Sequence, residues 1–231
     1  MNWDVLTWTP GTLSNSYDVD PGNPGTDITF TVSGTTNTFT NDTNSGVLTP
    51  AITNSLAGGL SPVQKSLELA ADLRTNSKIT MTVNFSPLYT LGVKNVSFSL
   101  FDIDLETNKD RISSIYGIAL DGSKVAATIT FGSAISRTGT GLGQALTGVD
   151  PSPDTGPGSG AGTATIRFGS TPIKGFTFMW TNSNGAPFYQ QIAMGDIFFD
   201  VVPEPNAAAV ATLICILAAT IRRRGLRNSD R

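Results

Sequence analysis

The stretch ITMTVNF, residues 79–85, decides the fold, because its apolar residues occupy every second position: Ile79, Met81, Val83 and Phe85. Successive side chains of a β-strand point to opposite faces of the sheet, so this spacing places the four apolar side chains on one face. The polar residues between them then lie on the other face. The stretch therefore predicts a half-buried strand.

The same alternation recurs on both sides of this stretch. DITFTV (27–32) and VSFSLFDI (96–103) each place apolar residues at every second position. Further runs rich in β-branched and aromatic residues, separated by turn residues, follow at 112–120, 124–131, 163–168, 175–180 and 194–201. Asp121-Gly122 predicts a hairpin between two of these runs, because glycine tolerates the positive φ of a tight turn. We expect about eight or nine strands.

Three segments depart from this pattern. Residues 3–8 (WDVLTW) are typical of the start of a first strand. Residues 62–73 (PVQKSLELAADL) have a helix-like composition, whereas residues 66–72 alone are also compatible with a strand that leads into a turn at 75–77. Residues 138–163 contain eight glycines and three prolines, which predicts a long flexible loop outside the core.

Composition restricts the fold and the function. Charged residues make up only 14 % of the 231 residues, which suits short strands and tight turns, and we expect one antiparallel β-sandwich over residues 1–200. The net charge is −3, but residues 222–231 contribute +4, so residues 1–221 carry −7. Such an acidic domain repels phosphate backbones and argues against nucleic-acid binding. The chain has no histidine and one cysteine, which excludes histidine-dependent catalysis, histidine zinc sites and intramolecular disulfides.

The C-terminal segment has three parts in a fixed order. Pro203, Glu204 and Pro205 end the last predicted strand, because proline fixes φ and lacks an amide donor. An uncharged run follows at 207–221 (AAAVATLICILAATI), and then come three basic residues, Arg222, Arg223 and Arg224. The apolar run predicts a single transmembrane helix, and the arginines place its end in the cytoplasm and residues 1–205 outside.

This order of motif, apolar run and basic end over residues 203–231 resembles the PEP-CTERM sorting signal. The resemblance implies processing by a membrane-embedded exosortase and delivery to the cell envelope, the cell surface or an exopolysaccharide matrix. Residues 1–10 (MNWDVLTWTP) contain no basic and apolar regions of the kind that form a secretory signal peptide.

Segments of the preceding domain also carry a resemblance. NVSFSLFDID (95–104), DRISSIYGIALDG (110–122) and QQIAMGDIFFD (190–200) look like strands of the β-sandwich domains often found upstream of such tails. These domains are similar in outline to jelly-roll carbohydrate-binding modules. The resemblance therefore implies a jelly-roll-like architecture and makes a polysaccharide a candidate partner.

Four aspartates are candidate calcium ligands: Asp102, Asp104, Asp110 and Asp196. Calcium binds six to eight hard oxygens, which a strand end and its loop can supply. The alternative is that these residues are solvent-exposed turn acids that keep the domain soluble. Asp102 and Asp196 are also the candidate pair for carboxylate-dependent glycoside hydrolysis.

Several aromatic residues are candidates for stacking on sugars: Trp3, Trp8, Tyr116, Trp180 and Tyr189. Large aromatics in strands are more often core residues, and Trp180 at the end of GFTFMW fits that description. Phe188 and Tyr189 follow a predicted turn and are the preferred glycan-binding residues. The sequence predicts a non-catalytic surface or matrix protein that binds glycan or calcium; the alternatives are an envelope-associated glycoside hydrolase and a purely structural matrix protein.

Overall fold

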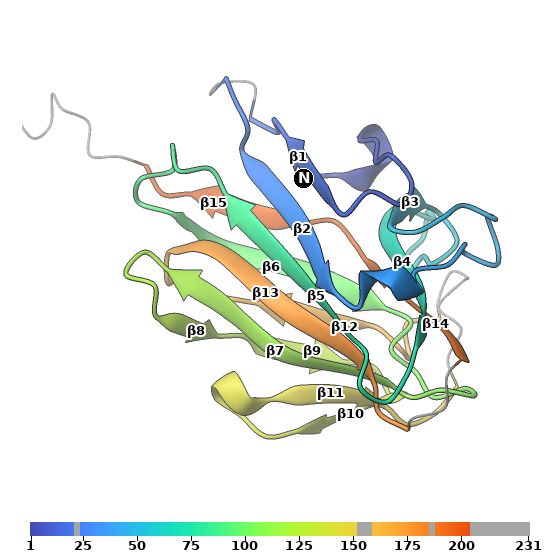
Figure 1. Ribbon diagram of the computed structural model, residues 1–231. Coiled ribbons are helices and arrows are strands. Elements are labelled where there is room, and N and C mark those ends of the chain that lie inside the picture. Colours follow the sequence, from blue (N-terminus) through green and yellow to red (C-terminus); the bar gives the residue numbers. More distant parts are fainter. Residues whose placement is uncertain (21–23, 152–158, 185–187, 204–231) are drawn as a thin grey trace, which may run out of the picture.

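The computed structural model describes residues 1–20, 24–151, 159–184 and 188–203 (Figure 1). These residues contain fifteen strands and three short 3-10 helices, and every strand pair is antiparallel. The all-β antiparallel prediction is confirmed. Within these ranges no helix has the length and apolar character needed to cross a bilayer. The helix predicted at 207–221 lies outside the described residues.

Strand pairing divides the domain into two layers. Among the described residues, one strand residue pair, Ile173 with Val93, connects the two layers. The first layer, at the front of Figure 1, runs in the order β1 (Ser14–Tyr17), β2 (Ile28–Gly34), β5 (Lys78–Phe85), β13 (Ile173–Asn182), β7 (Asp110–Ala119), β11 (Ala145–Gly148) and β10 (Ile135–Thr138), with β8 (Lys124–Ala126) also on β7. The second layer runs β3 (Ala51–Thr53), β4 (Ser66–Leu73), β14 (Phe188–Met194), β6 (Val93–Phe101), β12 (Ala164–Arg167) and β9 (Thr128–Phe131), and β15 (Phe198–Val201) also pairs with β6.

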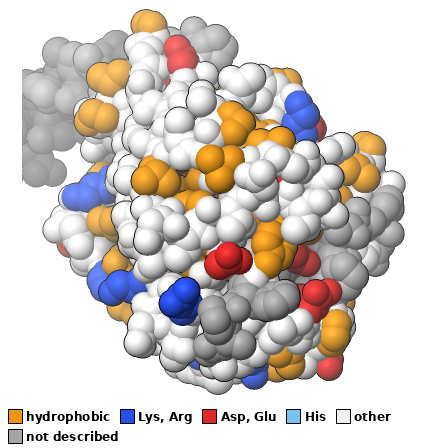
Figure 2. Space-filling view, turned by 45° about the vertical axis from the view of Figure 1, so that its right-hand side comes forward, with side chains coloured by type: hydrophobic (Ala, Val, Ile, Leu, Met, Phe, Trp, Pro, Cys, Tyr) orange, Lys and Arg blue, Asp and Glu red, His pale blue; other side chains and the backbone are white. Residues whose placement is uncertain are grey.

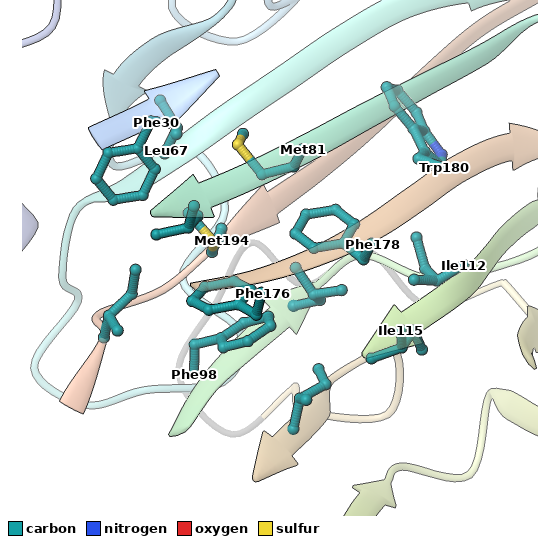
Figure 3. Packing of buried hydrophobic residues seen from close by; sticks show 14 of the residues in the cluster. Phe30, Leu67, Met81, Phe98, Ile112, Ile115, Phe176, Phe178, Trp180 and Met194 are labelled. Atoms are coloured by element: carbon teal, nitrogen blue, oxygen red, sulfur yellow. The ribbon is translucent and has the colours of Figure 1, made fainter. Parts of the chain in front are cut away.

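The core lies between these layers (Figure 3). Phe98 of β6 stacks on Phe176 of β13, with ring centroids 4.5 Å apart, and Phe178 lies 6.1 Å from Phe98. The predicted alternation is confirmed in β5, where Ile79, Met81, Val83 and Phe85 are buried. The Asp121-Gly122 hairpin is also confirmed, since Gly122 has φ 87° and β8 returns along β7.

The first predicted strand is wrong. Residues Trp3–Val5 form a 3-10 helix, η1, and pair with no strand. The Trp3 ring is fully buried 5.3 Å from Phe30, and its indole N–H donates to the carbonyl of Gly195. The segment therefore packs over the core through its tryptophan instead of extending a sheet.

The segment 62–73 contains the strand β4, not a helix. The main core contains Leu67, Leu69, Ala71 and Leu73. Between them, Ala70 is hydrogen-bonded to the segment before β3, and Glu68 is hydrogen-bonded to the loop after β3. Burial on both faces explains the helix-like composition, because such a strand loses the apolar and polar alternation that marks a half-buried one.

The flexible loop predicted at 138–163 is wrong over its first part. Residues 145–148 form the buried strand β11, which pairs with β7 and β10, and residues 141–143 form the 3-10 helix η3. A Cβ atom added to Gly148 would lie 1.9 Å from the backbone oxygen of Asp104. Glycine at this position allows two backbone segments to approach each other closely, so it does not indicate a flexible loop. Residues 152–158 lie outside the described part of the chain.

Candidate functional site

A cleft of about 290 Å³ opens where three segments meet: the residues before β4, the loop between β6 and β7, and the start of β14. Every lining side chain except that of Leu56 carries a hydrogen-bonding group. The lining consists of Thr43, Asn44, Leu56, Asp102, Asp104, Glu106, Thr107, Asn108, Asp110, Tyr189, Gln190 and Gln191.

The loop between β6 and β7 is fixed by backbone hydrogen bonds. The amide of Asp110 donates to the carbonyl of Asp104 at 3.0 Å, which closes the loop, and the amide of Leu105 donates to the carbonyl of Asp150 at 3.2 Å. Asp102 has φ 63°, a left-handed conformation that aspartate tolerates better than most residues. These constraints, together with the close approach of Gly148, hold several carboxyl groups at the wall of the cleft.

Asp110 is a fully buried acid at the base of this wall. Its Oδ1 accepts hydrogen bonds from the indole of Trp180 at 2.8 Å and from the amide of Gln190 at 3.0 Å. Burial raises the pKa of Asp110 well above its usual value, the Trp180 hydrogen bond opposes that shift, and the charges of Asp102 and Asp104 add to it. Burial therefore favours the neutral form of this carboxyl group.

Tyr189 is positioned on the opposite wall by a polar network. Its hydroxyl donates to Oε1 of Gln191 and accepts from the amide of Thr43. The side-chain amide of Gln191 in turn donates to Asp42 and Glu68, each at 3.2 Å. The ring of Tyr189 is half-buried and faces the cleft from a fixed position.

Glu68 is the second perturbed acid of this region. It is fully buried on β4, where its carboxyl accepts from the amide of Leu56 at 3.0 Å. Burial raises the pKa of Glu68 to about 7; a hydrogen bond from Thr53 opposes the shift, and the charge of Asp42 adds to it. For Asp42, hydrogen bonds from Ser45, Asn44 and Ser55 outweigh a burial effect of the opposite sign and lower its pKa.

Gln190 carries an unsatisfied acceptor at the cleft. The residue is 5 % exposed, and its amide nitrogen donates to Asp110. Among the described residues its Oε1 has no hydrogen-bond partner. A buried polar atom without a partner costs free energy, so this oxygen favours a ligand that donates a hydrogen bond.

The structure brings together three of the four predicted calcium ligands and separates the fourth. Asp102, Asp104 and Asp110 line the cleft, whereas Asp196 accepts a hydrogen bond from the amide of Trp3 and lies near the N-terminal ammonium. Within the described ranges no three acidic or cysteine side chains are grouped closely enough to hold one metal ion. Asp196 therefore contacts the N-terminal segment, whereas the other three aspartates line the cleft. Calcium binding and the hydrolase pair of Asp102 and Asp196 stay predictions.

Among the predicted sugar-stacking residues, Tyr189 lies in the cleft. Trp3, Trp8 and Trp180 are core residues, with Trp180 fully buried, and Tyr116 lies under Lys124 on the β7–β8 hairpin. Phe188 begins β14 opposite Leu73, and its side chain lies outside the described residues. Glu204, Pro205 and the three arginines of the tail also lie outside the described residues, whereas Pro203 is described and exposed.

Sequence reasoning missed Glu68, Gln190 and Gln191. The two consecutive glutamines stand between aromatic and apolar residues in a strand, so one of them faces each side. Buried side-chain amides need hydrogen-bond partners. The glutamine pair in this strand was therefore the signal in the sequence for a polar site. The glutamate in the apolar run SLELAADL was a second signal.

No protein-family model and no curated protein sequence matches this chain. Among solved structures, a carbohydrate-binding module studied for specific mannan recognition aligns at 11 % identity over 60 % of this chain and 75 % of its own, with a TM-score of 0.33. The family 11 carbohydrate-binding module of a Clostridium thermocellum cellulosomal cellulase aligns at 12 % identity over 87 % and 92 %, with a TM-score of 0.32. An exo-β-agarase aligns at 10 % identity over 85 % and 26 %, with a TM-score of 0.33. Similarity at this level assigns neither a ligand nor a site to this chain.

Proposed function

We propose that the β-sandwich is a non-catalytic, jelly-roll-like glycan-binding domain and that the cleft is its sugar site. The observation that carries this proposal is the composition of the lining, in which carboxyl, amide and hydroxyl groups surround one half-buried tyrosine. Sugar hydroxyls both donate and accept hydrogen bonds, and fixed carboxylates and amides are suited to them. The ring of Tyr189 supplies a flat apolar surface for one face of a pyranose.

Rigid positioning supports recognition by this cleft. Tyr189 is held by Thr43 and Gln191, and Gln190 is held by Asp110, so little side-chain freedom remains to be lost on binding. Among the residues that the structure describes, Oε1 of Gln190 has no hydrogen-bond partner, and a donor group of a ligand would supply one. A polar ligand with several hydroxyl groups therefore suits the site better than an apolar one.

Screening the purified full chain on a glycan array, followed by calorimetric titration of the best ligand, tests the proposal. We expect Tyr189→Ala to weaken binding by about tenfold or more, since a buried aromatic contact at a site centre is commonly worth more than 1 kcal/mol. Tyr116→Ala removes a tyrosine outside the cleft and is the matched control. Failure to bind any glycan, or equal losses in both variants, would refute the proposal.

Glycoside hydrolysis is the second candidate, because Asp110, whose pKa is raised by burial, shares the cleft with other acids. Its Oδ1 is already occupied by Trp180 and Gln190, and the side chain is 3 % exposed, so it has poor access to a leaving-group oxygen. Binding without turnover is therefore favoured. If the protein released reducing sugar from the bound glycan, and Asp110→Asn abolished this release, hydrolysis would be favoured over binding alone.

For the tail, the proposal is that residues 203–231 act as a sorting signal that an exosortase processes. Its support is the order of Pro203-Glu204-Pro205, the uncharged run 207–221 and the arginines at 222–224. The full chain, expressed behind a secretory signal peptide, is expected in the membrane fraction of cells without exosortase and in the released fraction of cells that contain it. Deletion of 203–231 should release the domain in both. Full-length chain in the soluble fraction of cells without exosortase would contradict the proposal.

A further inference from the structure

The walls of the cleft are acidic. Four of the lining residues are carboxylic acids: Asp102, Asp104 and Glu106 supply the negative charge, whereas burial favours the neutral form of Asp110. None of the lining residues is a lysine or arginine. Figure 2 brings the right-hand side of Figure 1 toward the reader and shows Asp and Glu side chains gathered on this face. A concave surface lined by one sign of charge concentrates its field, so a cation is attracted to this cleft and an anion is repelled.

The pKa of Asp110, the buried acid at the base of the cleft, is affected by the same negative charges. Burial is the main cause of the raised pKa of Asp110, but the charges of Asp102 and Asp104 raise it further. The two aspartates therefore act on a side chain at the base of the cleft, where burial limits solvent screening. A positive group placed there would be stabilised by the same charges that disfavour a third carboxylate.

Gln190 adds an observation that does not depend on charge. Its side chain is 95 % buried at the cleft, and its Oε1 has no partner among the described residues. An ammonium group carries three hydrogen-bond donors and no acceptor. It is therefore matched to the amide oxygen of Gln190 and to the negative charge of the carboxylates that line the same cleft.

We propose that the cleft selects glycans that carry a free, protonated amino group, such as de-N-acetylated amino sugars, over neutral, N-acetylated or acidic glycans. This inference rests on the proposed glycan-binding function and names its substrate class. The ammonium lies toward Asp102, Asp104 and Gln190, and the sugar ring lies toward Tyr189. A cleft of about 290 Å³ is at the lower end of small-molecule sites, which suits a short stretch of sugar.

Calorimetric titration of the full chain with three oligosaccharides of equal length tests the inference. The ligands are a glucosamine oligomer, its N-acetylated form and a glucose oligomer, at about pH 6, where a sugar amine is protonated. We expect the glucosamine oligomer to bind about tenfold more tightly than the other two, with a preference that declines as salt is added.

Two variants with matched loss of charge separate a local from a general effect. Asp102→Asn keeps a residue that tolerates the left-handed backbone and should reduce the preference for the amino sugar several-fold. Asp121→Asn removes the same charge from the β7–β8 hairpin and should leave the preference unchanged. Equal losses in both variants would overturn the inference, because they would indicate nonspecific attraction.

The remaining outcomes are distinguishable. If the three oligomers bind equally, or a neutral or acidic glycan binds best, the amino-sugar preference is wrong while the proposed glycan-binding function stands. If none of the three oligomers and no glycan on the array binds, both are wrong.

Discussion

Gln191 makes three side-chain hydrogen bonds in the network behind the cleft. Its amide nitrogen donates to Asp42 and Glu68, and its amide oxygen accepts from Tyr189. Glu68 and Gln191 are diagonal neighbours on adjacent strands, since Glu68 lies opposite Ala193 and Gln191 lies opposite Ala70. A buried polar network with its members satisfied fixes side-chain positions, so the orientation of Tyr189 depends also on Asp42 and Glu68, which are not among the lining residues of the cleft.

Glu68 should make stability depend on pH. Its pKa is raised from 4.5 to about 7 in the folded state, so between these values the folded chain holds a proton that the unfolded chain releases. The contribution is full below about pH 4.5 and is lost as pH rises through about 7. We expect a loss on the order of 2 to 3 kcal/mol over this range.

The measurement is urea unfolding of the wild type and Glu68→Gln at a series of pH values. Glutamine resembles the protonated acid, so the free-energy difference between the two proteins should change with pH across this window. The chain has no histidine to titrate in the same range. Parallel pH profiles for the two proteins would disprove the assignment.

At the scale of elements, β11 connects the core to the site. It pairs with β7 through Leu146 and Ile112, and its last residue, Gly148, lies against the backbone of Asp104. The strand therefore supports the loop that carries the acids of the cleft. Its composition, rich in small residues, is a requirement of this close packing.

Gly148→Ala should destabilise the fold and displace the acidic loop. A Cβ at this position would lie 1.9 Å from the Asp104 oxygen, and backbone atoms cannot move aside as a flexible side chain can. We expect a loss of about 1 to 3 kcal/mol or more and weaker ligand binding. The measurements are thermal unfolding and calorimetric titration.

Gly143→Ala is the control for this substitution. Gly143 lies in η3, where an added Cβ would meet nothing within 4 Å. Its stability should change by no more than about 0.5 kcal/mol. Equal stability of the two variants would show that the backbone approach at Gly148 does not matter.

At the scale of the whole molecule, aromatic packing between the layers holds the sandwich together. Phe176 contacts Phe98 of the other layer and also lies near Phe85 and Phe168, at centroid distances of 6.3 and 5.9 Å. Figure 3 shows Phe98, Phe176 and Phe178 side by side between the strands. Within the second layer, β14 is aligned with the end of β6 by direct strand pairing, Ala193 with Phe101.

Phe176→Ala should cost about 3 to 5 kcal/mol of unfolding free energy, because it removes buried area and leaves a cavity. Phe198→Ala is the matched control, since that ring is 63 % exposed and its removal should change stability by less than about 0.5 kcal/mol. Chemical denaturation of both variants checks the expectation. A cost below 1 kcal/mol for Phe176→Ala would contradict this account of the core.

Part of the local structure of this protein was predictable from the sequence. Alternation in ITMTVNF and DITFTV is a property of neighbouring residues, so it predicted strands, and Asp121-Gly122 predicted its hairpin. For residues 62–73 the sequence left a helix and a strand open, and the strand is confirmed as β4; for β11 the sequence prediction failed. Both strands are buried on two faces, which depends on segments far away in the chain. The acidic loop and Tyr189 were also recognisable as polar groups at strand ends.

Only the tertiary structure decided which of these groups form a site. Asp110 meets Gln190 across 80 positions and Asp42 meets Gln191 across 149, whereas Asp196, six positions from Gln190, is directed to the N-terminal segment. Strand alternation determines the face of the sheet on which a side chain lies, but strand order and register determine which residues it contacts. These are set by the packing of the whole core, and for that reason three of the four predicted calcium ligands lie in one cleft while the fourth contacts the N-terminal segment.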